Sequence, residues 1–134
     1  MVPVMAKFEC FEFDPVIYPF KLWVARNGTK ADVKAMFVDG DWEDLVITDA
    51  EVKRSAALSF DPVVAVSDGQ RGVFTWLHTP EAVTTGTIAH EADHAANAVF
   101  DAIGASVNPT NDEPHAYLVG FFADCIDEVL KRKS

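Results

Sequence analysis

A change in the spacing of apolar residues near residue 84 is the strongest constraint on what this chain can fold into. Segments 84–103 and 112–131 carry apolar residues at helical spacing, whereas residues 1–78 contain short aromatic and β-branched runs separated by turn residues. Gly104 and the stretch NPTND separate the two helical segments. We therefore predict a small antiparallel sheet followed by two long helices, which is an α+β fold.

The strands are predicted in the first 78 residues of the chain. Four segments have strand composition: 7–13, 16–25, 62–67 and 72–78. Pro19 lies inside the second segment and indicates a sheet edge or a bulge. The turn sequence at 68–71, Asp-Gly-Gln-Arg, predicts that the last two segments form a hairpin.

Two short helices are predicted between these strands. Thr29 with Asp32 three residues later resembles a capping box, and Asp39-Gly40 is expected to end that helix. A second short helix is predicted near 49–57, with Asp49 as its N-cap.

Length and composition favour one folded domain over residues 1–134. The chain has no internal repeat and no linker long enough to divide it, and 49% of its residues are hydrophobic, which is enough to form a core. Cys10 and Cys125 lack any C-x-x-C spacing, so we expect two buried thiols.

The chemistry is carried by an H-E-x-x-H sequence, residues 90–94, inside the first long helix. At about 100° per residue, His90 and His94 leave the same side of a helix one turn apart and can share one metal ion. Glu91 borders that pair and could reach a water molecule on the ion. The pattern also occurs by chance, on a solvated helix face with two incidental histidines.

Zinc in a catalytic site needs a third protein ligand, and Glu113 is the leading candidate. It lies nineteen residues after His94, at the start of the second long helix, where Asn111 is expected as N-cap and Pro114 in the first turn. Asp112 and His115 are the alternatives. We expect one face of this helix to lie against the histidine helix, with Gly120 allowing close approach. That face consists of Glu113, Tyr117, Gly120, Phe121 and Asp124.

His90, Glu91 and His94 with Glu113 resemble the zincin metallopeptidases, in particular the gluzincins, whose third ligand is a Glu on the following helix. The resembling region is about 84–122, and it is also similar to small uncharacterised zincin-like proteins of bacteriophages. The resemblance implies a minimal zincin fold, Zn²⁺ as cofactor and an edge strand that pairs with extended substrate. It also implies that Glu91 acts as general base.

One position departs from the gluzincin pattern. Four residues after the ligand Glu, the better-known members have an Asp that supports a histidine, and this chain has Tyr117. Tyr117 is a candidate to bind a ligand residue or to steady the oxyanion, and equally a candidate for packing. Phe100 occupies the third-ligand position of metzincins, and Asp101 lies too far along the helix to share the ion.

Other polar and aromatic residues receive structural interpretations. His78 and His115 are expected to be structural, although His115 could act as an acid. Tryptophans 23, 42 and 76 are expected in the core or in a pocket lining, and the acidic stretch 39–44 is expected to be a solvated loop because it lacks the EF-hand pattern.

A net charge of −10 makes nucleic acid and anionic membrane surfaces poor partners. The N-terminal stretch 1–14 does not have the organisation of a signal peptide and no apolar run is long enough to span a bilayer, so we expect a cytoplasmic protein.

We predict a zinc metallopeptidase that acts on a peptide or protein substrate. A peptidase dedicated to one partner protein would look the same in sequence. The alternative is a catalytically inactive binding or structural protein, such as a phage-associated one, in which a metal staples the two long helices. A zinc-dependent base deaminase is disfavoured because its P-C-x-x-C ligand pair is absent.

Overall fold

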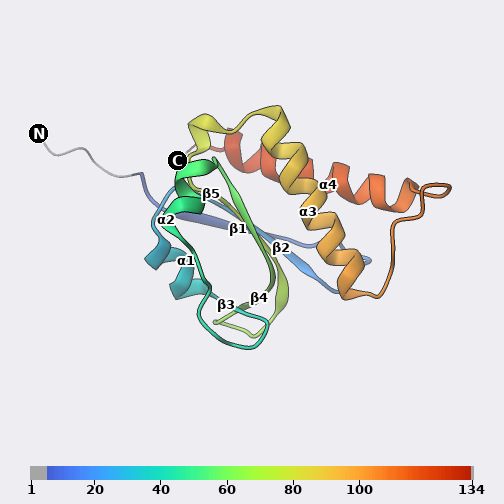
Figure 1. Cartoon of the computed structure of the whole chain (residues 1–134), viewed down its shortest axis with the longest axis horizontal. Helices are drawn as coiled ribbons and strands as arrows, with labels where there is room; N and C mark the ends of the chain where they lie inside the picture. The colour runs from blue at the N-terminus through green and yellow to red at the C-terminus, as the bar shows by residue number, and fades with distance from the viewer. Residues whose placement is uncertain (1–5, 134) are drawn as a thin grey trace, which may run out of the picture.

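The computed structural model of the chain describes residues 6–133. Residues 1–5, on which part of the signal-peptide interpretation rests, lie outside the described residues. The strands are β1 (Glu9–Phe13), β2 (Lys21–Arg26), β3 (Phe37–Asp39), β4 (Leu58–Ala65) and β5 (Arg71–Leu77). The helices are α1 (Lys30–Met36), α2 (Asp49–Arg54), α3 (Thr85–Ala102) and α4 (Glu113–Lys131), with a 3₁₀ turn, η1, at Pro80–Ala82. The α+β class is confirmed (Figure 1).

The five strands form one sheet in the order β1-β2-β5-β4-β3. The predicted β4–β5 hairpin is confirmed, and Gly69 in its turn adopts φ of +73°. The prediction of a purely antiparallel sheet is wrong, because β2 and β5 pair in parallel and the sheet is mixed. Strand periodicity shows which residues share a face, but it does not show which strand pairs with which.

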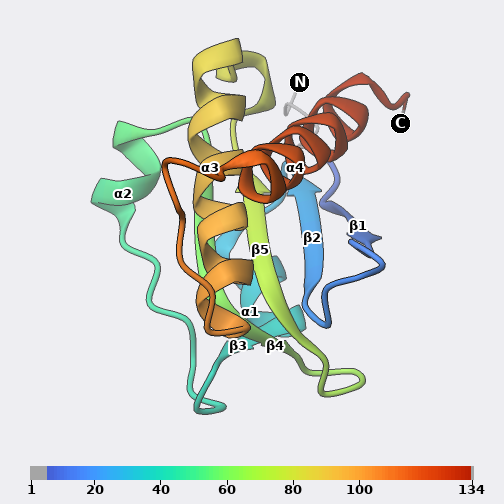
Figure 2. The same ribbon diagram turned by 90° about the vertical axis from the view of Figure 1, so that its right-hand side faces the viewer.

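The two long helices cover one face of the sheet, as Figure 2 shows. Leu22, Val24, Val73 and Leu77 point from β2 and β5 into the core beneath α3 and α4. The alternate residues of the same strands face a second core on the opposite side, where Val33 of α1 and the loop residues Leu45 and Ile47 are buried. Of the three tryptophans, Trp23 and Trp76 are buried in this second core, whereas Trp42 is exposed.

Local capping signals place the short helices. Thr29 and Asp32 form the predicted capping box of α1, but this helix ends at Met36 and is followed directly by β3, which the sequence did not predict. The N-cap of α2 is Thr48, which forms a capping box with Glu51, so the prediction of Asp49 as the cap is wrong. Pro19 lies before β2 rather than inside it.

The start of α4 differs from its prediction. Its N-cap is Asp112 and not Asn111, and the Asp112 side chain makes no capping hydrogen bond. Pro114 does lie in the first turn, as predicted. The buried residues of the helix are Leu118, Phe122, Cys125, Ile126 and Val129. The predicted packing face is exposed instead: a Cβ added at Gly120 would have no neighbour within 4 Å.

Both cysteines are free thiols, with Cys125 buried and Cys10 partly buried. Burial raises the pKa of each thiol to about 12. Within residues 6–133, no helix combines the length and the apolar character needed to cross a bilayer.

Candidate metal and catalytic site

Helix α3 is placed by a strong N-terminal cap and by a row of small residues. Thr84 and Thr87 form a reciprocal capping box at its start. Alanines 92, 95, 96 and 98 are buried, so the helix lies close to β4 and β5. With its alanine side on the sheet, α3 leaves His90 and His94 exposed and turns Glu91 inward.

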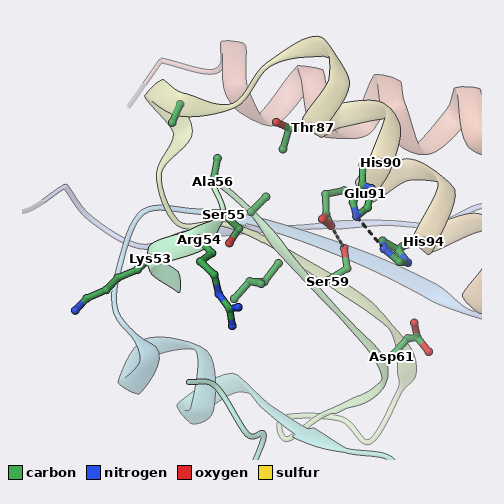
Figure 3. A pocket seen from close by; sticks show the side chains of 13 residues that line it. Lys53, Arg54, Ser55, Ala56, Ser59, Asp61, Thr87, His90, Glu91 and His94 are labelled. Carbon is green, nitrogen blue, oxygen red and sulfur yellow. Dashed lines mark hydrogen bonds between the residues drawn. The ribbon is translucent and has the colours of Figure 1, made fainter. Parts of the chain in front are cut away.

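The two imidazoles converge on one point. The Nε2 atoms of His90 and His94 are 3.0 Å apart, and the rings meet edge to face with centroids 4.6 Å apart (Figure 3). Two nitrogen ligands of one tetrahedral zinc lie about 3.3 Å apart, given Zn–N distances of about 2.0–2.1 Å. The histidine pair therefore fits two positions in the coordination sphere of one cation.

Glu91 is buried beside this pair, with 5% of its surface exposed. The Ser59 hydroxyl of β4 donates a hydrogen bond of 2.7 Å to Glu91 Oε2, and it lies 2.9 Å from the hydroxyl of Thr75 on β5. Sequence reasoning missed Ser59 and Thr75. A signal was present for Thr75, which is the polar residue in the otherwise apolar run 73–77 of β5, but Ser59 lies at an ordinary polar position of the alternation in β4.

A cavity of about 660 Å³ opens in front of these residues. His90, Glu91 and His94 of α3 line one side, and Ser59 and Asp61 of β4 line it together with residues 53–57 from the end of α2 and the segment that follows. Figure 3 shows the side chains of Glu91 and Ser59 directed toward each other at one wall of this cavity. A substrate group placed there would meet Glu91 and both imidazoles together.

Asp61 enters the cavity from an irregularity in β4. The β4–β5 register shifts between Phe60 and Val63, which leaves Asp61 and Pro62 outside the ladder. Partial burial and the negative charge of Asp101 raise the pKa of the Asp61 carboxyl, and His94 opposes that rise. An acidic group thus lies on the sheet side of the histidine pair.

Glu113 does not join the histidines. Among residues 6–133, no group of three or more His, Cys, Asp or Glu side chains is arranged to hold a metal ion. Glu113 is exposed in the first turn of α4, and Tyr117 is 75% exposed. The residues therefore fit a cation as a pair of ligands, while the predicted third ligand and the predicted contact of Tyr117 with the site are not assembled.

His115 connects the start of α4 to α3. Its Nε2 lies 2.8 Å from Asn97 Oδ1, and its ring meets the Phe100 ring edge to face. Asn97 lies three residues after His94 and is exposed on the same side of α3. The first turn of α4 is thus held about one turn beyond the histidine pair.

His78 makes two side-chain hydrogen bonds away from the histidine pair. Its Nε2 lies 3.0 Å from the Ser55 hydroxyl, and its Nδ1 lies 2.9 Å from the Thr79 hydroxyl. Burial lowers the pKa of His78 below its usual value, which favours the neutral ring. Both ring nitrogens are engaged, which agrees with the predicted structural role.

Comparison of the chain with protein-family models, with curated proteins and with solved structures finds no match.

Proposed function

We propose that this protein is a zinc-dependent metallopeptidase that hydrolyses peptide bonds. The observation that carries the proposal is a buried carboxylate, Glu91, beside two imidazoles whose Nε2 atoms are 3.0 Å apart, all facing one cavity. A convergent imidazole pair is a suitable site for a divalent cation, and a carboxylate beside it is a suitable general base. The resemblance to gluzincins supports the same reaction.

The roles follow from where the side chains lie. His90 and His94 in their neutral forms would hold the ion, with Glu113 as third ligand once the first turn of α4 approaches them. Zinc, when bound, acidifies water and polarises a carbonyl group. Glu91 would accept the proton of the attacking water and return it to the leaving amine. Tyr117, one turn after Glu113, would approach the cavity with it.

The first half of β4 offers a place for an extended peptide. Strand β3 pairs only with residues 63–65 of β4, and within residues 6–133 no strand pairs with residues 58–60 on that side. The same segment lines the cavity through Leu58 and Ser59. An extended substrate could form main-chain hydrogen bonds there, beside Glu91.

A second candidate function is metal-dependent binding without turnover. The exposed position of Glu113 and the two-ligand arrangement favour it, because a cation held by an open pair of histidines can bind a partner's carboxylate without catalysis. The two candidates differ in what Glu91 contributes.

Substitution of Glu91 by Gln separates the two candidates. We expect Glu91→Gln to keep the zinc content of wild-type protein while abolishing cleavage of a mixed peptide library, because Gln keeps the shape and loses the base. Glu43→Gln, in an exposed loop, is the matched control and should cleave normally. Wild-type cleavage by Glu91→Gln would exclude the mechanism, and zinc binding without any cleavage would favour the binding function.

Zinc content itself tests the ligand set. We expect about one zinc per chain by elemental analysis, with His90→Ala, His94→Ala and Glu113→Ala each losing most of it. Protein that takes up no zinc even after zinc addition would exclude both functions. Full retention in Glu113→Ala would move the third ligand to Asp112, His115 or another group.

A further inference from the structure

Two hydroxyl groups lie among apolar side chains on the face of the sheet beneath α3 and α4. Ser59 of β4 and Thr75 of β5 are direct cross-strand partners. The neighbouring positions of β5 on the same face are Val73 and Leu77, both fully buried. A hydroxyl at Thr75, with no exposed surface, is costly to bury unless it is hydrogen-bonded.

The donor and the acceptor of each hydrogen bond among Thr75, Ser59 and Glu91 follow from the number of hydroxyl protons available. Ser59 has one hydroxyl proton, which it donates to Glu91 Oε2. The contact of 2.9 Å between the Ser59 and Thr75 hydroxyls therefore requires Thr75 to be the donor. The chain runs from Thr75 to Ser59 to Glu91 and ends on a carboxylate acceptor, which is the arrangement of a charge-assisted hydrogen bond.

The other oxygen of Glu91 is left for the cavity. Within the part of the chain that the structure describes, Glu91 Oε1 has no hydrogen-bond partner. This oxygen is not fully buried, so solvent or a substrate can reach it. Glu91 also lines the cavity. The carboxylate is thus held through one oxygen by the sheet and presents the other toward the cavity.

We propose that Ser59 is a positioning residue for Glu91, supported from behind by Thr75. This inference rests on the proposed peptidase function for its kinetic consequence, but the hydrogen-bonded chain exists without metal or substrate. Ser59 fixes the orientation of the base that takes the proton of the attacking water. Thr75 orients the Ser59 hydroxyl by occupying one of its acceptor positions.

Substitutions that remove or keep the hydroxyl test the kinetic consequence. We expect Ser59→Ala to lower kcat about 10- to 100-fold, as for supporting residues around other sites, with KM and zinc content unchanged. Ser59→Thr keeps a hydroxyl and should restore most of the rate. Thr75→Val should give a smaller loss of the same kind. Ser67→Ala is the matched control and should keep the wild-type kcat, because Ser67 is exposed in the β4–β5 turn and does not line the cavity.

A spectroscopic measurement on metal-free protein tests the positioning without any activity. Proton NMR should detect the Ser59 and Thr75 hydroxyl protons, because burial and hydrogen bonding slow their exchange with water. We expect Glu91→Gln to move the Ser59 hydroxyl signal upfield, since a neutral amide is a weaker acceptor than a carboxylate, and Ser55→Ala to leave it in place. Ser59→Ala should shift the Thr75 signal as well.

The outcomes of the two experiments are separable. If the hydroxyl signals respond as expected and no peptide is cleaved, the hydrogen-bonded chain stands and the peptidase proposal fails. If Glu91→Gln abolishes cleavage while Ser59→Ala retains wild-type kcat, the peptidase proposal stands and the positioning role is overturned. A Ser59 hydroxyl signal that does not change in Glu91→Gln also overturns it.

Discussion

The two halves of α4 are held by very different contacts. The C-terminal half buries Phe122, Ile126 and Val129 against α3 and the sheet, and the buried Arg26 of β2 donates hydrogen bonds to the carbonyls of Val129 and Arg132 at the end of the helix. The N-terminal half begins without a side-chain cap and exposes its first turn to solvent. Leu118 is its buried residue, and His115 makes its hydrogen bond to α3.

This difference bears directly on the candidate site. His90, Glu91 and His94 lie on a helix that is capped and packed on the sheet, so their mutual geometry is set by the fold. Glu113 lies on the half of α4 with few buried contacts, which is the kind of region that opens or shifts at low free-energy cost. The fold thus fixes the positions of His90 and His94 and leaves Glu113, the expected third ligand, on an exposed turn with few buried contacts.

The largest expected effect contrasts a core aromatic residue with an exposed one on the same helix. Phe122→Ala should lower the free energy of unfolding by about 3–5 kcal/mol, because Phe122 has no exposed surface. Tyr117→Ala should change it by less than about 0.5 kcal/mol. Urea denaturation monitored by tryptophan fluorescence measures both. A large loss in Tyr117→Ala would mean that the N-terminal half is packed after all.

Zinc should stabilise the N-terminal half of α4 and so reduce the difference in local stability between the two halves of the helix. If Glu113 completes the site, zinc at a thousandfold excess over its Kd raises the free energy of unfolding by about 4 kcal/mol. Hydrogen exchange of the amides of 113–118 should then slow, while exchange at 125–129 should change little. The protein without zinc should stay folded, because the apolar sides of both helices pack on the sheet regardless.

Two controls sharpen the zinc experiment. A chelator should lower the Tm at pH 7.5 and have a smaller effect at pH 5, because protons compete with the metal for the imidazole nitrogens. His94→Ala should lose the zinc response. Zinc binding with no change in exchange at 113–118 would show that the ion does not bridge α3 and α4.

The polar contacts at the C-terminal end of α4 should contribute more to the free energy of unfolding than those at its N-terminal end. Arg26→Met should cost about 2 kcal/mol of unfolding free energy, because two charge-assisted hydrogen bonds to helix carbonyls are lost from a buried site. His115→Ala should cost less than about 1 kcal/mol, since its hydrogen bond to Asn97 is exposed. Chemical denaturation of both variants gives the comparison. Equal costs would contradict the difference between the two ends.

The smallest expected effect is the contribution of His78 to the pH dependence of stability. Burial lowers the pKa of His78 in the folded state below the usual histidine value of about 6.5, so the unfolded chain binds more protons than the folded one as pH falls below that value. This contribution to stability is complete above pH 6.5 and is lost as pH falls through the lower folded pKa. His78→Gln should therefore show a flatter decline of Tm between pH 7 and 5. An unchanged decline would exclude His78 as a source of the pH dependence.

Short-range sequence patterns correctly predicted the start of α1, the β4–β5 hairpin and both long helices. Thr29 and Asp32 mark the start of α1, the turn at 68–71 marks the β4–β5 hairpin, and apolar spacing predicts both long helices. These features depend on residues within a few positions of one another. The spacing of His90 and His94 is local in the same sense, and the structure brings their Nε2 atoms together as the helix geometry requires.

Sequence patterns did not predict the contacts between segments that lie far apart in the chain. Parallel pairing of β2 with β5 depends on how the intervening strands are arranged, and strand composition does not encode it. The sequence predicts that the face of α4 with Glu113 and Tyr117 lies against α3, because Glu113 is the candidate ligand. The opposite face carries the buried apolar residues, and it determines the rotation of the helix.

Spacing along the chain is enough to predict a helix with two histidines one turn apart and a glutamate beside them, because helical geometry depends only on that spacing. The burial of Glu91 against Ser59 and the exposure of Glu113 follow instead from tertiary packing. Those outcomes depend on how α3 and α4 rotate and slide on the sheet, and that placement is determined by the total apolar area buried rather than by any local pattern.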